Sequence, residues 1–192
     1  MNNIIVFIET ESGQIADVSL ELLTKGRELS SKLNCNLEAV LIGFNVKPLT
    51  EELFNYGAQK IYVADDKKLE FFLTLPYSAI INELFRKEKP QIALFGATSI
   101  GRDLAPRVSS ALTSGLTADC TSLEIGSHTE AKTGKVYDGL LYQIRPAFGG
   151  NIIATIINPD CRPQMATVRE GVMKKEPLSN PVKGVIEMID VH

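Results

Sequence analysis

The residues of this chain best suited to binding chemistry lie in one short segment. Residues 145–151 read Arg-Pro-Ala-Phe-Gly-Gly-Asn, so a guanidinium, an aromatic ring, two glycines and an amide follow one another closely. The guanidinium of Arg145 can lie against a planar anionic ring, and Gly149 and Gly150 allow backbone to approach a ligand near the ring of Phe148. The plainer interpretation is a β-turn in which Arg145 is solvated or paired with a carboxylate. Both interpretations stay open on local chemistry alone.

A second segment, residues 96–107, reads Gly-Ala-Thr-Ser-Ile-Gly-Arg-Asp-Leu-Ala-Pro-Arg and joins a predicted strand to a predicted helix. A helix N-terminus presents unpaired N–H groups to an anion, and Arg102 and Arg107 add positive charge. The alternative is a simple turn with Asp103 as the N-cap. The segment is not a P-loop, and the turn after the first strand carries no Gly-x-Gly-x-x-Gly.

Composition excludes several classes of protein. The chain has 192 residues, 44% of them hydrophobic, and a net charge of −3, which is ordinary for one globular domain and argues against a nucleic-acid partner. No apolar run approaches the length of a membrane span. Three widely spaced cysteines and two histidines predict free thiols, a cytoplasmic location and no metal site. No nucleophile–histidine pair stands out, so we assign no catalytic residue.

Apolar runs alternate with helical periodicity along the first half of the chain. Short apolar runs predict buried parallel strands, and spacings of three and four predict helices between them. The predicted strands are residues 4–8, 37–42, 61–63 and 92–95, and the predicted helices are residues 17–33, 50–57, 76–87 and 103–112. Thr50 is the predicted N-cap of the second helix. This alternation predicts an α/β fold with a doubly wound, mostly parallel sheet and helices on both faces.

The second half has a different pattern. Helical periodicity fades after Thr117, and short strands are predicted at residues 120–125, 136–144, 152–157 and 167–168. The polar turn between the first two predicts an antiparallel hairpin added to the sheet. The tail contains one further candidate for an edge strand, residues 185–189.

Four ordered segments resemble the N-terminal domain of the α subunit of electron transfer flavoproteins. They are residues 96–107, residues 115–120 (Gly-Leu-Thr-Ala-Asp-Cys), residues 145–151 and residues 165–169 (Met-Ala-Thr-Val-Arg). The predicted strand order is compatible over the whole chain. The resemblance implies that residues 1–192 form one domain of this type, and that the C-terminal FAD-binding domain of the family is absent from this chain.

The resemblance also implies a function: an electron-carrying subunit rather than an enzyme on its own. The implied partner is an electron transfer flavoprotein β subunit in a heterodimer, which carries electrons between NADH or an acyl-CoA-type dehydrogenase and an acceptor, by bifurcation in anaerobic members. The implied cofactor is FAD, held mainly by the β subunit and by the absent domain. In bifurcating members Arg145 is expected beside the isoalloxazine ring, with Phe148, Gly149, Gly150 and Asn151 shaping the wall. A positive charge about 4 Å from a flavin anion contributes about 4 kcal/mol at an effective dielectric of about 20, or about 170 mV for one electron.

Two other functions remain open from the sequence. One is a freestanding nucleotide-binding α/β domain that uses residues 96–107 as its anion site. The other is a structural partner domain that binds no cofactor. In members of the family that hold AMP instead of the second FAD, Arg145 would likewise be structural.

Overall fold

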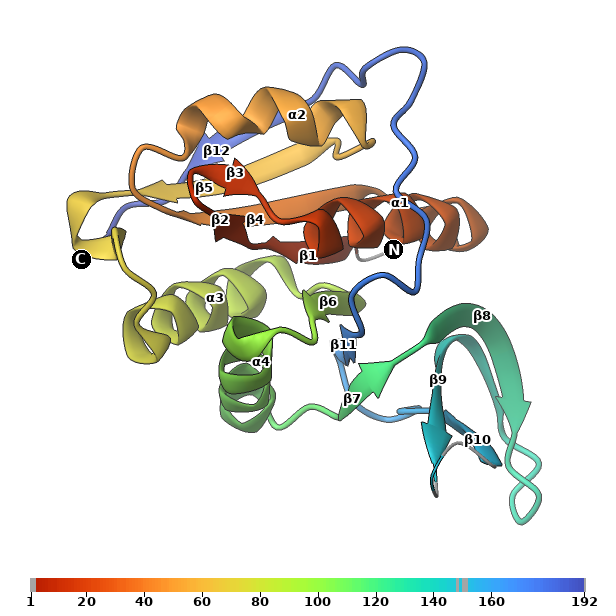
Figure 1. Ribbon diagram of the computed structural model, residues 1–192. Coiled ribbons are helices and arrows are strands. Elements are labelled where there is room, and N and C mark those ends of the chain that lie inside the picture. Colours follow the sequence, from red (N-terminus) through yellow and green to blue (C-terminus); the bar gives the residue numbers. More distant parts are fainter. Residues whose placement is uncertain (1–2, 148, 150–151, 192) are drawn as a thin grey trace.

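A seven-stranded parallel sheet forms the centre of the molecule (Figure 1). The computed structural model describes residues 3–147, 149 and 152–191. The strand order is β12-β5-β4-β1-β6-β11-β7, and all neighbours run parallel. In that order the strands span Val185–Met188, Lys60–Asp65, Leu37–Gly43, Ile4–Ile8, Ile92–Gly96, Gln164–Val168 and Leu116–Cys120.

Helices cover both faces of this sheet, as the alternating sequence pattern predicts (Figure 1). One face packs against α1 (Asp17–Leu33) and α2 (Thr50–Asn55), and the other against α3 (Thr74–Glu88) and α4 (Ser99–Leu112). Every residue of β1 and β4 is buried, which explains why these strands appear in the sequence as continuous apolar runs. The doubly wound α/β class is therefore confirmed. Among the residues that the structure covers, no helix has the length and apolarity to cross a membrane.

Four short elements complete the first half of the chain. The turn after β1 folds into a short hairpin, and 3-10 helices precede α2 and follow β5. These elements are β2 (Thr10–Glu11), β3 (Gln14–Ile15), η1 (Lys47–Leu49) and η2 (Lys67–Leu69).

The predicted hairpin forms, but within a sheet of its own. Its strands β8 (Ser122–Thr129) and β9 (Val136–Ala147) pair antiparallel, and β10 (Ile152–Ile156) adds a third strand beside β9. The chain leaves the parallel sheet after β7 and returns at β11, and these two strands are neighbours. The antiparallel sheet is therefore the crossover between two parallel strands, a position that a helix ordinarily occupies.

Two strand predictions are wrong in their boundaries. Residues 120–125 do not form one strand, because the chain passes from the parallel sheet to the antiparallel sheet at Thr121. Residues 167–168 are the end of the longer β11, which lies between β6 and β7 with all five residues buried. Sequence periodicity does not reveal which sheet a short strand joins, and this explains both errors.

One predicted helix start and one predicted N-cap are also wrong. Helix α4 begins at Ser99 rather than at Asp103, because the hydroxyl of Thr98 caps it by accepting from the Gly101 N–H at 3.0 Å. Helix α2 continues directly from η1, so the Thr50 hydroxyl donates back to the Lys47 carbonyl at 2.8 Å instead of capping.

Candidate functional site

A strained aspartate marks the carboxyl end of β7. Asp119 has a φ of 62°, in the left-handed region that a non-glycine residue rarely adopts. Its N–H donates to the hydroxyl of Thr167 on β11 at 2.9 Å, and the register between these two strands shifts at this point. The irregular backbone places the Asp119 carboxylate at the edge of the sheet where β6, β7 and β11 end.

Two arginines hold this carboxylate. Arg169, directly after β11, contacts both of its oxygens, with Nη2–Oδ2 at 2.7 Å and Nε–Oδ1 at 3.2 Å. Arg102, on the first turns of α4, places Nη2 at 3.6 Å from Oδ1. The hydrogen bond from Arg169 lowers the pKa of Asp119, and the charges of Arg169, Arg102 and Arg145 lower it further.

Arg145 is the third arginine near this carboxylate. It lies within β9, opposite Ala154 of β10, and not at the end of a strand as the sequence suggests. It is half-buried, and no hydrogen bond or ion pair joins its guanidinium to any residue that the structure describes. We call Arg102, Arg145, Arg169 and Asp119 the arginine cluster; its formal net charge is +2.

The remaining predicted site residues are only partly covered by the structure. Gly149 is exposed with a φ of 71°, and the space where a side chain would project is open. Phe148, Gly150 and Asn151 lie outside the described residues. The structure therefore places Arg145 beside Asp119, Arg102 and Arg169, while the wall predicted from residues 148–151 stays a prediction.

Cys120 follows Asp119 and is fully buried. Burial raises the pKa of its thiol to about 12, although the charge of Arg145 opposes this rise. The thiol is protonated near neutral pH and does not act as a nucleophile.

The second predicted segment, residues 96–107, opens onto a crevice between the carboxyl ends of β1 and β6. Strand order reverses here, which is where doubly wound sheets bind ligands. However, Glu9, Glu11 and Glu170 all line this crevice, and among the described residues that line it Arg102 is the one cation. Three carboxylates beside the N-terminus of α4 disfavour a phosphate ligand.

Glu9 is a buried carboxyl group within that crevice. Its Oε2 accepts from the Thr98 hydroxyl at 2.7 Å, while its Oε1 has no hydrogen-bond partner within the described part of the chain. Burial raises the pKa of Glu9, and the charge of Glu170 adds to this rise.

The glycines of this segment serve packing. A Cβ at Gly101 would lie 1.9 Å from the Gly96 carbonyl oxygen, and one at Gly96 would lie 2.7 Å from Glu9 Oε1. Gly101 therefore lets α4 approach the end of β6 closely, Gly96 leaves room for the Glu9 side chain, and neither is needed to admit a ligand.

Buried amides fix the antiparallel sheet to the parallel one. Gln164, at the start of β11, is fully buried; its Oε1 accepts from the Leu141 N–H at 2.8 Å, and its Nε2 donates to the Gly139 carbonyl at 3.3 Å. Gln91 donates to the same carbonyl at 3.1 Å. These bonds set the position of β9, and therefore of Arg145, relative to the parallel sheet.

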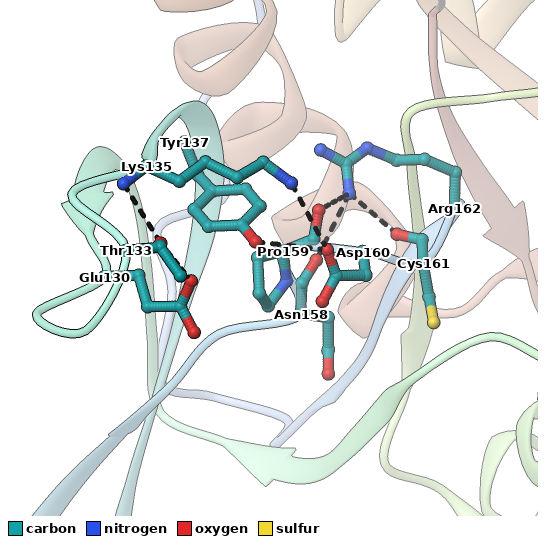
Figure 2. A network of polar contacts seen from close by, with 9 residues as sticks. All are labelled: Glu130, Thr133, Lys135, Tyr137, Asn158, Pro159, Asp160, Cys161 and Arg162. Carbon is teal, nitrogen blue, oxygen red and sulfur yellow. Dashed lines mark hydrogen bonds and ion pairs between the residues drawn. The ribbon is translucent and has the colours of Figure 1, made fainter.

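The loop before β11 provides a contrast to Arg145 (Figure 2). Arg162 directs Nη1 at the carbonyls of Asn158, Pro159 and Cys161, at 3.2, 3.2 and 2.7 Å. The Tyr137 hydroxyl donates to Asp160 at 3.3 Å and ties this loop to β9. Arg162 is thus occupied by backbone carbonyls, whereas Arg145 is not.

Asp119 is the residue of this site to which the sequence assigned no role. It occurs within the segment Gly-Leu-Thr-Ala-Asp-Cys, at the end of a parallel strand, and a charged residue in that position was the available signal. Its two arginine partners lie 17 residues before it and 50 after it, and sequence spacing does not connect them.

Fold and site together define a doubly wound α/β domain that presents a surplus of positive charge from an antiparallel crossover. A family model described as electron transfer flavoprotein domain matches residues 4–192. The chain belongs to this family, as its sequence motifs predicted.

Curated relatives agree with this assignment. The chain is 48% identical over 170 residues to the electron transfer flavoprotein subunit alpha of Thermoanaerobacterium thermosaccharolyticum, covering 88% of this chain and 48% of the relative. It is 49% identical over 172 residues to the subunit of the same name from Megasphaera elsdenii, covering 90% and 48%. It is 40% identical over 189 residues to the lactate dehydrogenase (NAD(+),ferredoxin) subunit LctC of Acetobacterium woodii, covering 98% and 43%. The chain spans about half the length of these relatives.

Proposed function

We propose that this chain is the first domain of an electron transfer flavoprotein α subunit and that it acts as an electron carrier without substrate chemistry of its own. The observation that supports this most is Arg145, a half-buried guanidinium with no hydrogen-bond or ion-pair partner among the described residues. It lies in a cluster of net charge +2, next to arginines that are paired. A cation that is not neutralised by such a partner stabilises a ring that gains negative charge beside it.

FAD is the cofactor of this proposal, presented by a β subunit against the antiparallel sheet and bound a second time by the family's C-terminal domain. The residues of this chain fit such a group, since they offer surplus positive charge and open space at Gly149. Arg145 would lie against the isoalloxazine, and Phe148, Gly150 and Asn151 would complete the wall. FAD supplies the redox chemistry when bound. This chain supplies a fixed charge that favours the reduced, anionic ring.

The proposal extends to partners. The chain forms a heterodimer with a β subunit and carries electrons between NADH or an acyl-CoA-type dehydrogenase and an acceptor, with bifurcation as the mode that an unpaired Arg145 favours. Relatives named as an acryloyl-CoA reductase electron transfer subunit and as a lactate dehydrogenase (NAD(+),ferredoxin) subunit support this range. Three free cysteines support the cytoplasm as its location.

The test begins with flavin absorbance, for the chain alone and co-purified with a candidate β subunit. We expect a colourless chain and a yellow heterodimer. In that heterodimer Arg145→Ala should lower the flavin reduction potential, because a stabilising cation is lost. Arg107→Ala is the matched control, since Arg107 pairs with Asp103 on the same helix at 3.7 Å. A potential unchanged by Arg145→Ala would overturn the proposed role.

Titration of the chain alone with AMP or ATP tests the alternative function, a freestanding nucleotide-binding domain. That function would require the chain alone to bind AMP or ATP, with binding lost on Arg102→Ala. The three carboxylates of the crevice count against it, and we expect no saturable binding.

A further inference from the structure

The carboxylate of Asp119 is in contact with two arginines and is influenced by the charge of a third, Arg145. Arg169 grips it with two hydrogen bonds, Arg102 approaches one oxygen, and Thr167 fixes the backbone N–H. A two-point contact of this kind fixes the plane of the guanidinium as well as its position. Arg169 is therefore oriented by Asp119 and not by solvent.

The backbone of Asp119 is the second observation. A φ of 62° is uncommon for a residue with a Cβ, and aspartate is among the few that adopt it. Here the strained residue is the one whose side chain enters the arginine cluster. The strain thus coincides with the placement of a negative charge.

The Asp119 carboxylate lowers the net positive charge of the arginine cluster. With Asp119 ionised the cluster carries +2, and a neutral residue in its place would leave +3. Its side chain is 27% exposed, compared with 62% for Arg102 and 47% for Arg169. The carboxylate therefore lies deeper than the two cations that it holds, where solvent screens it less.

We propose that Asp119 is a positioning residue that sets both the orientation and the net charge of the arginine cluster, and that it thereby limits how strongly the cluster favours reduction of a flavin facing it. This inference rests on the proposed function. Its chemistry is electrostatic: a negative charge near the ring offsets part of the effect of Arg145. The charge of Asp119 is opposite to that of Arg145. The flavin reduction potential therefore lies between the values expected with either charge alone.

The experiment measures the flavin reduction potential in heterodimers that carry Asp119→Asn. Asparagine keeps the size of the side chain and tolerates a left-handed backbone, so the change removes the negative charge and one of the two acceptors of Arg169 without altering the side-chain volume. We expect the one-electron reduction equilibrium to shift towards the reduced form by up to about tenfold, equivalent to about 59 mV. The shift should shrink as salt is raised, because the cluster is partly exposed. Asp103→Asn, which removes an exposed carboxylate from the neighbouring helix, should leave the potential unchanged.

The outcomes separate the two proposals. If Arg145→Ala lowers the potential but Asp119→Asn matches the unmodified protein, this inference fails alone. If Arg145→Ala has no effect, the proposed function fails, whatever Asp119→Asn does. Should Asp119→Asn not assemble, Asp119→Gly removes the same carboxylate and suits the same φ. An equal shift in Asp103→Asn would also overturn the inference.

Discussion

The two sheets of this domain differ in how completely they are buried. The parallel sheet is sandwiched between helices, and its central strands β1 and β4 are buried throughout. The antiparallel sheet has exposed apolar side chains, such as Ile153 on β10, and is joined to the parallel sheet by the amides of Gln164 and Gln91. Apolar burial stabilises both sheets, because Leu123 on β8 and Leu141 on β9 belong to the same buried cluster as β1 and β4. Directional hydrogen bonds in addition give the antiparallel sheet a defined position. The candidate site lies where the two sheets meet.

Truncation of a central apolar residue in the parallel sheet should have the largest effect on the free energy of unfolding. Leu41→Ala, on β4, should lower the free energy of unfolding by about 2–5 kcal/mol, because it leaves a cavity in a fully buried strand. Ile153→Ala, on β10, should change it by less than about 0.5 kcal/mol. Urea unfolding of the two variants measures both free energies, and equal losses of stability would refute the proposed difference in burial between the sheets.

Loss of the amide connection should rank second. Gln164→Met keeps the length of the side chain but leaves the buried Leu141 N–H without its acceptor, at a cost of about 1–3 kcal/mol. Hydrogen exchange should also quicken in β9 more than in β1. Gln14→Met, at an exposed position of β3, is the control. Uniformly faster exchange in both sheets would show that Gln164 supports the whole core instead.

The buried carboxyl of Glu9 predicts a smaller, pH-dependent effect at the end of the parallel sheet. Because the pKa of Glu9 in the folded state is raised above the ordinary 4.5, the folded state retains this proton to a higher pH than the unfolded chain does. Stability is therefore highest below the ordinary pKa and declines as pH rises through the raised one. Glu9→Gln should abolish this decline in urea unfolding measured from about pH 4 to about pH 8. Glu11→Gln, an exposed neighbour, should retain it.

Alanine substitutions of Arg145 and Arg162 should have the smallest effects on the free energy of unfolding. In the isolated chain, Arg145→Ala should alter the free energy of unfolding by no more than about 0.5 kcal/mol, because no partner is lost. Arg162→Ala should cost about 1 kcal/mol, because three carbonyl contacts go with it. Thermal unfolding distinguishes the two. A larger loss for Arg145 would show that this arginine is structural and would weaken the proposed flavin role.

Local sequence was enough to predict the parallel sheet but not its last strands. Strands such as β1 and β6 are apolar runs bounded by polar turns, so burial on both faces makes them visible. Strand β11 is short, and only its pairing with β6 and β7 shows where it belongs. The break at Thr121 was missed for the same reason, since two strands that follow without a turn look like one.

The site was predictable in part. Arg145 stands out by residue type and by its resemblance to a family motif. Asp119 does not, because its importance arises from a left-handed backbone and from two arginines brought to it by the fold. A site assembled from three elements is a tertiary property, and one sequence without its fold shows only the separate parts.

The crossover between β7 and β11 is anchored to the parallel sheet at both of its ends. At the carboxyl edge the Arg169 N–H donates to the Cys120 carbonyl at 2.9 Å, and at the amino edge the Gln164 N–H donates to the Gln91 carbonyl at 2.9 Å. A segment anchored at opposite edges of a rigid sheet has little freedom to swing. A partner that docks on it meets the backbone of Arg145 already in place, and only the side chain of this arginine loses conformational entropy on binding.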